Sequence, residues 1–191
     1  MADHSAAIKA QVESAYQQQR PVNIIGGGSK SFMGRVSVGE PLNLAQHSGI
    51  VAYEPTELVL TARAGTPITE IQQVLAAHDQ QLAFEPPAFK GKATLGGTLA
   101  GNQSGPCRPW QGSVRDAVLG VRLINGRGEH LKFGGQVRKN VAGYDLSRLQ
   151  AGAMGCLGVI TEISLKVIPK PAVSSSLMVT MSEQDALVLM T

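Results

Sequence analysis

Two glycine clusters are the segments of this chain whose residue types best suit ligand chemistry. The first is Gly26-Gly27-Gly28-Ser29-Lys30-Ser31, and the second runs from Thr94 to Gly105. Glycine tolerates positive φ and lets main-chain N–H groups approach an anion without a Cβ in the way. The two clusters predict two backbone-lined cradles for one long, phosphate-bearing ligand, and a dinucleotide fits that description.

Each cluster also has a simpler interpretation. The first contains Gly-Ser-Lys-Ser, but a nucleotide-triphosphate loop needs glycine directly before the lysine, where Ser29 stands. No G-x-G-x-x-G follows a strand, which disfavours a nicotinamide-binding fold. A plain structural turn stays open for the first cluster. A flexible linker is the alternative for the second, although linkers rarely alternate glycine with residues such as Leu95 and Leu99.

The second cluster continues into a segment with two cations. Arg108 and Arg115 follow it closely, and the cluster itself carries threonine, asparagine, glutamine and serine side chains. These groups can bind phosphate oxygens and the polar edge of a ring. Arg115 and Asp116 form a structural ion pair in the alternative interpretation.

Composition narrows the function classes. The chain has 191 residues, 17 Lys plus Arg against 14 Asp plus Glu, and 4% aromatic residues. This weak, dispersed positive charge and the scarcity of aromatics argue against nucleic-acid binding. Cys107 and Cys156 form no C-x-x-C pair and the four histidines are not clustered in sequence, so we expect no metal site and no disulfide framework. No apolar stretch is long enough to insert in a membrane.

The first half of the chain predicts alternating helices and strands. Apolar residues recur at helical spacing between residues 8 and 16, and Val22 to Ile25 form a short apolar run before the first cluster. Residues 50–64 are strand-like around a break at Glu54-Pro55-Thr56. Thr66 as a cap with Pro67 at the first helical position predicts a second helix. We expect an α/β first lobe.

The second half predicts strands and hairpins. Glu85-Pro86-Pro87 marks the expected boundary between the lobes. Residues 118–124 and 129–133 flank a tight turn and read as an antiparallel hairpin, and residues 159–168 alternate as a half-buried strand. Ser182 is a candidate helix cap. We expect a first lobe at residues 1–84, a second at 85–171, and the beginning of a truncated C-terminal cap region at 172–191.

Several longer motifs carry a specific resemblance. Lys139-Asn140-Val141-Ala142-Gly143-Tyr144-Asp145-Leu146-Ser147-Arg148-Leu149 and Gly155-Cys156-Leu157-Gly158-Val159-Ile160-Thr161-Glu162 resemble the closing motifs of FAD domains of the vanillyl-alcohol oxidase and p-cresol methylhydroxylase (PCMH) type. Residues 49–58, Arg108-Pro109-Trp110 and residues 112–116 support it. The similarity extends from about Pro21 to Pro171. Within the family it is strongest to flavin subunits of bacterial glycolate oxidase complexes.

The resemblance implies an α+β fold of two lobes, the first with a mainly parallel sheet and the second with a mixed or antiparallel one, with FAD between them. Histidine in the first loop often accompanies covalent flavin in this family, and its absence here implies non-covalent FAD. A thioether at Cys107 is a much weaker alternative. The implied FAD-binding residues are Gly26, Gly27, Gly28, Ser29, Lys30, Ser31, Thr94, Gly96, Gly97, Gln103, Ser104, Gly105, Arg108, Gly158, Val159 and Ile160.

The resemblance also implies a function. FAD in such proteins takes a hydride from the α-carbon of a 2-hydroxy acid such as glycolate. The implied partners are a second flavin subunit and an iron–sulfur subunit, in the cytoplasm and held at the inner membrane through those partners. The catalytic base stays unassigned, because the resemblance places the group that removes the substrate proton in a cap region beyond Pro171. Within the FAD domain, Tyr144 is the best candidate hydroxyl. A non-catalytic, FAD-loaded assembly subunit is the alternative.

Overall fold

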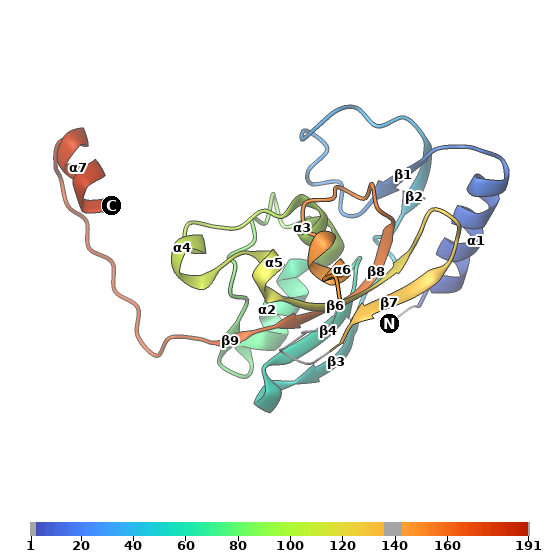
Figure 1. The fold of residues 1–191 in the computed structure, drawn as a ribbon. Coiled ribbons are helices and arrows are strands. Elements are labelled where there is room, and N and C mark those ends of the chain that lie inside the picture. Colours follow the sequence, from blue (N-terminus) through green and yellow to red (C-terminus); the bar gives the residue numbers. More distant parts are fainter. Residues whose placement is uncertain (1–2, 136–142, 191) are drawn as a thin grey trace.

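The computed structural model describes residues 3–135 and 143–190 (Figure 1). The helices are α1 Ser5–Gln17, the 3-10 turn η1 Pro55–Glu57, α2 Ile68–Ala76, α3 Leu95–Gly101, α4 Arg108–Gln111, α5 Val114–Ala117, α6 Leu146–Leu149 and α7 Glu183–Met190. The strands are β1 Val22–Ile25, β2 Glu40–Asn43, β3 Ile50–Glu54, β4 Val59–Arg63, β5 Gln80–Gln81, β6 Val118–Ile124, β7 His130–Gly134, β8 Val159–Lys166 and β9 Ile168–Pro169.

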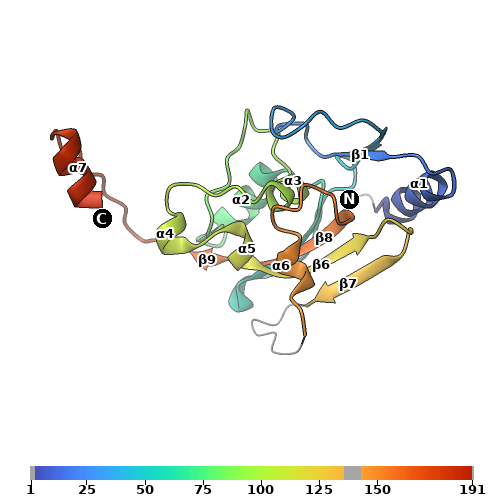
Figure 2. The ribbon, with the colours of Figure 1, turned by 45° about the horizontal axis from the view of Figure 1, so that its top comes forward.

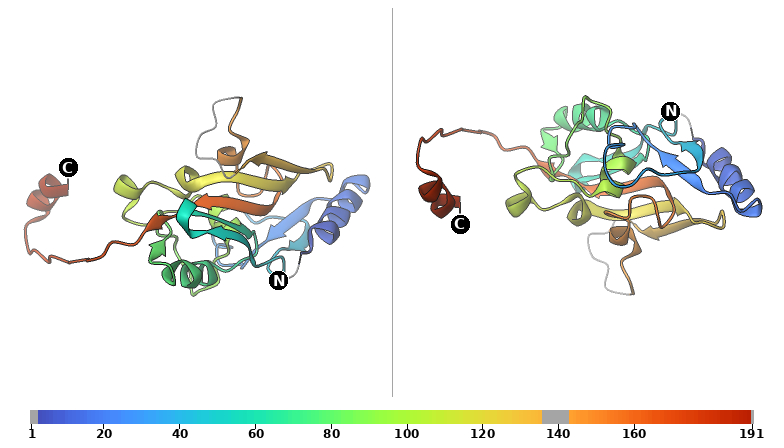
Figure 3. Two further views of the ribbon diagram at one scale, coloured as in Figure 1. Left: turned by 90° about the horizontal axis from the view of Figure 1, so that it is seen from below. Right: turned by 90° about the horizontal axis from the view of Figure 1, so that it is seen from above.

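A five-stranded antiparallel sheet forms the centre of the molecule. Its strand order is β3-β4-β8-β6-β7, and Ile163 in the middle of β8 pairs with Ala62 on one side and Val121 on the other. Figure 3 shows these strands side by side, with β7 at one edge. Strand β8, the last of these five in the sequence, thus lies at the centre of the sheet.

Helices α2 and α3 cover one face of this sheet and build the main core. Ile71 and Leu75 of α2 and Leu95 and Leu99 of α3 are fully buried, in one cluster with Leu60, Ile163 and Leu165 from the strands. Each such side chain contributes about 1.5–3 kcal/mol by leaving water. This packing fixes α3, and with it the second glycine cluster, relative to the sheet.

A smaller unit lies at one end of the large sheet. Strands β1 and β2 pair in parallel, and α1 packs on them through Ile8 and Val12. The cluster closes on Leu42, Leu44, Ile124 and Val159. Because Ile124 and Val159 belong to β6 and β8, the first glycine cluster, which follows β1, is held against the large sheet.

The structure confirms most predicted elements and corrects others. The prediction of a mainly parallel first sheet holds only in part: within the described residues, β1 and β2 pair in parallel, while β3 pairs antiparallel with β4, and β4 with β8. Strand partners are chosen by burial across the sheet, which a local pattern does not contain. The boundary at residues 84 and 85 stays a prediction, and the large sheet includes strands from both sides of it.

Two helix starts also differ from the predictions. Helix α2 begins at Ile68 with Pro67 as its N-cap, while the Thr66 hydroxyl donates to the Arg63 carbonyl over 2.7 Å and accepts from Gly49 N–H over 2.9 Å. Thr66 therefore joins two loops instead of capping the helix. The segment after Thr94, interpreted as a backbone-lined cradle or a flexible linker, forms α3, because Thr94 caps it and its leucines are buried.

The last residues leave the body of the protein. After β9, which pairs with β5, an extended segment leads to α7 (Figures 1 and 3). Ser182 caps α7 as predicted, its hydroxyl accepting from Asp185 N–H over 3.2 Å. In the extended segment, Leu177 is 90% exposed and Met178 is 96% exposed. Across the described ranges, no helix has the length and apolarity to span a membrane.

Candidate functional site

The first glycine cluster is a loop that leaves β1 with free backbone donors. Within the described part of the chain, the N–H groups of residues 26–31 have no hydrogen-bond acceptor. Gly28 has a φ of +65°, and a Cβ there would meet nothing within 4 Å. Ser29 and Lys30 are half-buried, whereas Ser31 is exposed. The loop presents successive N–H groups at a partly enclosed surface, which is the arrangement that binds anions.

The second cluster is built differently. Thr94 caps α3 by accepting from Gly97 N–H over 3.3 Å, and Gly96 N–H donates to the Ala64 carbonyl over 2.8 Å. Gly105 N–H donates to the Phe84 carbonyl over 3.0 Å. The expectation of a second backbone cradle is therefore wrong for Gly96, Gly97 and Gly105, because these donors already hold the fold together.

The two clusters nevertheless lie against each other. A Cβ on Gly26 would come within 2.7 Å of Thr94 Oγ1, and one on Gly27 would overlap the Lys92 carbonyl oxygen. The stem of Lys30 passes the C-terminal end of α3, with Cδ 3.3 Å from the Cβ position of Gly101. Figure 2 shows the loop after β1 beside α3. Glycine is required here because two backbones meet at contact distance.

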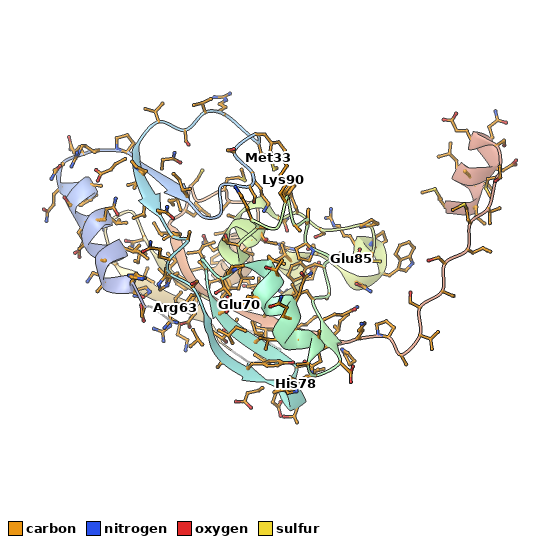
Figure 4. The ribbon with its side chains drawn as sticks, turned by 180° about the vertical axis from the view of Figure 1, so that it is seen from behind. Met33, Arg63, Glu70, His78, Glu85 and Lys90 are labelled. Atoms are coloured by element: carbon orange, nitrogen blue, oxygen red, sulfur yellow. The ribbon has the colours of Figure 1, made fainter. Side chains whose placement is uncertain are left out.

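Aromatic and sulfur contacts close the top of this junction. The Phe32 and Phe89 rings meet edge to face with centroids 5.5 Å apart, and Lys30 Nζ lies 5.3 Å from the Phe89 ring centroid. Gln103 Nε2 donates to Met33 Sδ over 3.1 Å. In Figure 4, Met33 and the neighbouring loop residue Lys90 lie at the same edge of the molecule. The loops following β1 and preceding α3 thus form a common roof.

Unsatisfied polar atoms gather under this roof. A buried polar group without a partner is rare in folded proteins and indicates a missing ligand or water. The buried atoms without a hydrogen-bond partner among the described side chains are Lys30 Nζ, Thr98 Oγ1, Asn102 Oδ1, Gln103 Oε1, Ser104 Oγ, Gln111 Oε1, Ser147 Oγ and Arg148 Nε. Of these, Arg148 Nε forms an ion pair with Asp145 Oδ2 over 3.4 Å. Five of these eight belong to the first loop or to α3 and the residues directly after it. The site contains donors and acceptors ready for a polar ligand.

Lys30 is the strongest indicator of the ligand's charge. Its burial lowers the pKa of the ammonium group, and no hydrogen-bond partner compensates for the lost water. A phosphate oxygen at this position would reverse that effect through a charge-assisted hydrogen bond. The site is therefore electrostatically suited to an anion.

A groove of about 710 Å³ lies between α1, β1 and the start of β8. Its walls include Ile24 of β1, Asn125 after β6, and Gly158 and Val159 at the start of β8. A Cβ on Gly155 would lie 3.2 Å from Ile24 Cδ1, so the segment before β8 borders the strand that leads to the first loop. The Val159 and Ile160 side chains are buried in the two cores, and both residues pair with β6 in the large sheet.

The opposite rim is formed by the turn after Gly105. Arg108 begins α4 and is exposed. Cys107 N–H donates to Glu85 Oε2 over 2.8 Å, and a further hydrogen bond to Glu85 raises the pKa of the Cys107 thiol. Tyr144 is 94% exposed, and the preceding motif residues 139–142 lie outside the described residues. This rim provides a cation and a thiol in its protonated form.

The histidines form a structural network away from the loops. His47 Nε2 bonds the Thr161 carbonyl oxygen over 3.0 Å, and His130 Nε2 bonds the Thr161 hydroxyl over 3.0 Å. His4 N–H donates to His47 Nδ1 over 3.1 Å. His4, His47 and His130, distant in sequence, are thus brought together, and they anchor the N-terminus to β8. No group of three His, Cys, Asp or Glu suited to a metal ion occurs among the described residues.

Sequence reasoning missed part of the site. Asn102 has a φ of +47° at the end of α3 and carries an unpaired buried oxygen, and Thr98 is fully buried with an unpaired hydroxyl. Both lie in the second cluster, where a polar residue within or at the end of a buried helix would have indicated a ligand contact. Gln111, Ser147 and Arg148 have no local pattern that distinguishes them.

Known proteins give matching results. A family model described as FAD binding domain matches residues 1–134. Glycolate oxidase subunit GlcE of Escherichia coli (strain K12) is 53% identical over 97% of this chain and 53% of its own length. D-lactate dehydrogenase of Anaerostipes hadrus is 32% identical over 90% of the chain and 36% of its own length. Glycolate oxidase subunit GlcD of Bacillus subtilis (strain 168) is 30% identical over 86% of the chain and 34% of its own length.

A solved structure supports the fold. Alkyldihydroxyacetonephosphate synthase matches with a TM-score of 0.73 over 90% of this chain and 31% of its own, at 22% identity. The chain spans about half the length of the GlcE relative. The structure has a mixed α/β fold with free donors and unpaired polar groups between two loops. Together with the family match, this shows that the chain belongs to the FAD binding domain family, of the PCMH type.

Proposed function

We propose that this chain is the FAD-binding part of a glycolate (2-hydroxy acid) oxidase or dehydrogenase subunit that works in a multi-subunit complex. The observation that carries the proposal is the buried Lys30 ammonium, which has no hydrogen-bond partner. Its stem passes Gly101 at the end of α3, directly before the unpaired oxygens of Asn102, Gln103 and Ser104. The 53% identity to GlcE supports the proposed substrate class.

The residues fit FAD along one path. The pyrophosphate would bind the N–H groups of residues 26–31, the Lys30 ammonium and the Ser104 hydroxyl, with Thr94 and Gly97 lining its back. The adenine end would occupy the groove beside Gly158 and the backbone of Val159 and Ile160, which has room for a ring system. The isoalloxazine end would lie toward Gln103, Gly105 and Arg108. The first loop contains no histidine, which agrees with non-covalent FAD.

FAD supplies the redox chemistry of such a site, accepting a hydride from the substrate carbon. This chain's residues bind the phosphates, orient the ring through Gln103 and Ser104, and exclude water beneath the roof formed by Phe32 and Phe89. Arg108 is placed at the rim to attract a carboxylate. Residues 1–84 and 85–171 are the proposed lobes, and residues 172–191 would begin a cap region that contributes the catalytic base.

One observation favours the second candidate, an FAD-loaded assembly subunit without its own catalysis. Near the site, the described residues supply no buried histidine or carboxylate, because His47 lies in the network with Thr161. Tyr144, the candidate hydroxyl, is exposed. Under either candidate, the proposed partners are a second flavin subunit and an iron–sulfur subunit, which would hold this cytoplasmic chain at the inner membrane.

The test separates binding from catalysis. The purified chain is loaded with FAD, excess cofactor is removed, and the flavin absorption is recorded before and after anaerobic addition of glycolate. Retained flavin that bleaches supports an oxidoreductase. Retained flavin that does not bleach, in the chain and in the assembled complex, supports the assembly role. Failure of the complex to retain FAD on this subunit would overturn both candidates.

A further inference from the structure

Glu85 has an unfavourable backbone conformation. Its φ is +41°, in the left-handed region, and it precedes Pro86. Left-handed backbone disfavours residues with a Cβ, and the residue before a proline prefers extended backbone. Such strain persists only where surrounding contacts hold it, and it concentrates at functional sites. For the chain reversal alone, glycine would serve better than glutamate.

The contacts of Glu85 converge on the turn after the second glycine cluster. Its Oε2 accepts the N–H of Cys107 over 2.8 Å, and the preceding Phe84 carbonyl accepts Gly105 N–H over 3.0 Å. A Cβ on Gly105 would lie 2.5 Å from Glu85 Cβ and 2.8 Å from its Oε2. The glutamate thus packs on the bare face of Gly105, and Figure 4 shows it beside the short helix α4.

This turn directly follows two of the unpaired polar groups. Gln103 Oε1 and Ser104 Oγ are buried and have no hydrogen-bond partner. The Gln103 amide is held on its other side, where Nε2 donates to Met33 Sδ over 3.1 Å. The direction of the Ser104 hydroxyl, and the position from which the Gln103 side chain extends, therefore depend on the backbone on either side. Helix α3 fixes the preceding side, and the Glu85 contacts to Gly105 and Cys107 fix the following side.

We infer that Glu85 is a positioning residue for the cofactor: its carboxylate holds residues 105–107 so that Gln103 and Ser104 face the FAD. The inference rests on the proposed FAD binding. The left-handed backbone brings the Glu85 carboxylate to the Cys107 N–H, and Gly105 leaves space for it. The strain at Glu85 is offset by these contacts.

Two variants separate positioning from a merely structural role. Glu85→Gly removes the carboxylate but suits a φ of +41°, so the melting temperature of the apoprotein is expected to stay unchanged or to rise. FAD affinity is expected to fall about tenfold because the turn is released. Glu85→Gln keeps an oxygen acceptor for the Cys107 N–H and is expected to bind FAD within about threefold of wild type.

The apoprotein provides a readout that needs no flavin. Hydrogen exchange of the Cys107 amide is expected to be slow in wild type and Glu85→Gln, and about tenfold or more faster in Glu85→Gly. Gly105→Ala serves as the reciprocal variant, because its Cβ would push Glu85 away. Its effect on FAD affinity is expected to be smaller in the Glu85→Gly background than in wild type.

Unchanged FAD affinity in Glu85→Gly would overturn the inference, as would a loss of affinity matched by a lower melting temperature of the apoprotein. An equally fast Cys107 amide in wild type and Glu85→Gly would also overturn it. If the wild-type chain fails to retain FAD even in the assembled complex, the proposed function is overturned. Amide exchange in the apoprotein then still decides separately whether Glu85 holds the turn.

Discussion

The two glycine clusters look alike in sequence, but their backbone N–H groups differ in whether the fold already uses them. Residues 26–31 keep their N–H groups free, whereas Gly96, Gly97 and Gly105 have already donated theirs to the protein. In the second cluster, the atoms left over for a ligand are on the side chains of Asn102, Gln103 and Ser104. One half of the site therefore binds with backbone and the other with side chains.

This difference predicts different responses to mutation. A backbone cradle is insensitive to side-chain type but fails when a Cβ blocks the approach of the two loops. A side-chain surface loses affinity one group at a time, without loss of fold. Lys30 belongs to the first loop yet acts through its side chain, so it tests both modes at once.

The largest effect is expected for Gly27→Ala. Its Cβ would overlap the Lys92 carbonyl oxygen, so the two loops must separate. We expect loss of FAD retention and a decrease of about 1–3 kcal/mol in the free energy of unfolding, as for other overpacked sites. Urea unfolding and the flavin absorption of the loaded protein measure the two effects.

Gly34→Ala is the control for backbone strain in the same loop. Gly34 has a φ of +77° and open space around its Cβ position, so it carries the conformational penalty without the clash. We expect a modest loss of stability, about 1 kcal/mol, with FAD retained. Equal FAD retention in Gly27→Ala and Gly34→Ala would contradict the contact between the loops.

Lys30→Met is expected to weaken FAD binding by a factor on the order of 10 to 100, the value of a charge-assisted contact. Because burial lowers the Lys30 pKa, the unfolded state binds the proton more tightly, and apoprotein stability rises with pH between the folded pKa and 10.5. Removing the lysine should abolish this rise without destabilising the apoprotein. Titration with FAD and unfolding at several pH values measure both effects.

Lys90→Met provides the matched control, because Lys90 is exposed on the adjacent loop (Figure 4). It removes one positive charge near the site but not the buried one. We expect FAD affinity within about threefold of wild type, as for an exposed charge. If Lys90→Met and Lys30→Met weakened binding equally, long-range attraction would account for the effect, and the specific role of Lys30 would be lost.

The sequence predicts those parts of the fold and of the site that depend on residues close together in the chain. The strands around residues 22–25, 118–124 and 159–166 and the first helix follow from apolar periodicity, and the first cluster from its composition. Strand β2 was missed because Glu40–Asn43 is short and contains a proline. The partner of β4 and the occupied glycine donors depend on contacts across the sheet, such as Gly96 N–H with Ala64, which no local pattern encodes.

Ser104→Ala tests the side-chain half of the site alone. The Ser104 hydroxyl is buried and unpaired, so removing it should leave the apoprotein equally or more stable. We expect FAD affinity to fall about 3- to 10-fold, the value of one neutral hydrogen bond. Ser37→Ala, which removes an exposed hydroxyl bonded to Asn23, is the control. A Ser104→Ala protein that loses stability but keeps its FAD affinity would place this hydroxyl in the fold and not in the site.

The smallest effect on the cofactor is expected from the network around His47, which lies away from both clusters. Burial lowers the His47 pKa, so the unfolded state takes up the proton first, and stability should decrease as pH falls through 6.5. Asp3 acts at lower pH. Hydrogen bonds from Ser5 lower its pKa to about 2, so its contribution is lost between pH 3.8 and 2.

The charges of Arg63 and His4 also disfavour the protonation of His47, while Asp3 and the Thr161 carbonyl favour it. His47→Gln should therefore flatten the loss of stability just below pH 6.5 and leave FAD affinity at neutral pH unchanged. His78→Gln, at an exposed histidine after α2, controls for removal of a histidine. Urea unfolding between pH 5 and 8 measures the slope. A weaker FAD affinity in His47→Gln would show that the anchored N-terminus supports the first glycine loop, and the two halves of the site would then differ in stability as well as in chemistry.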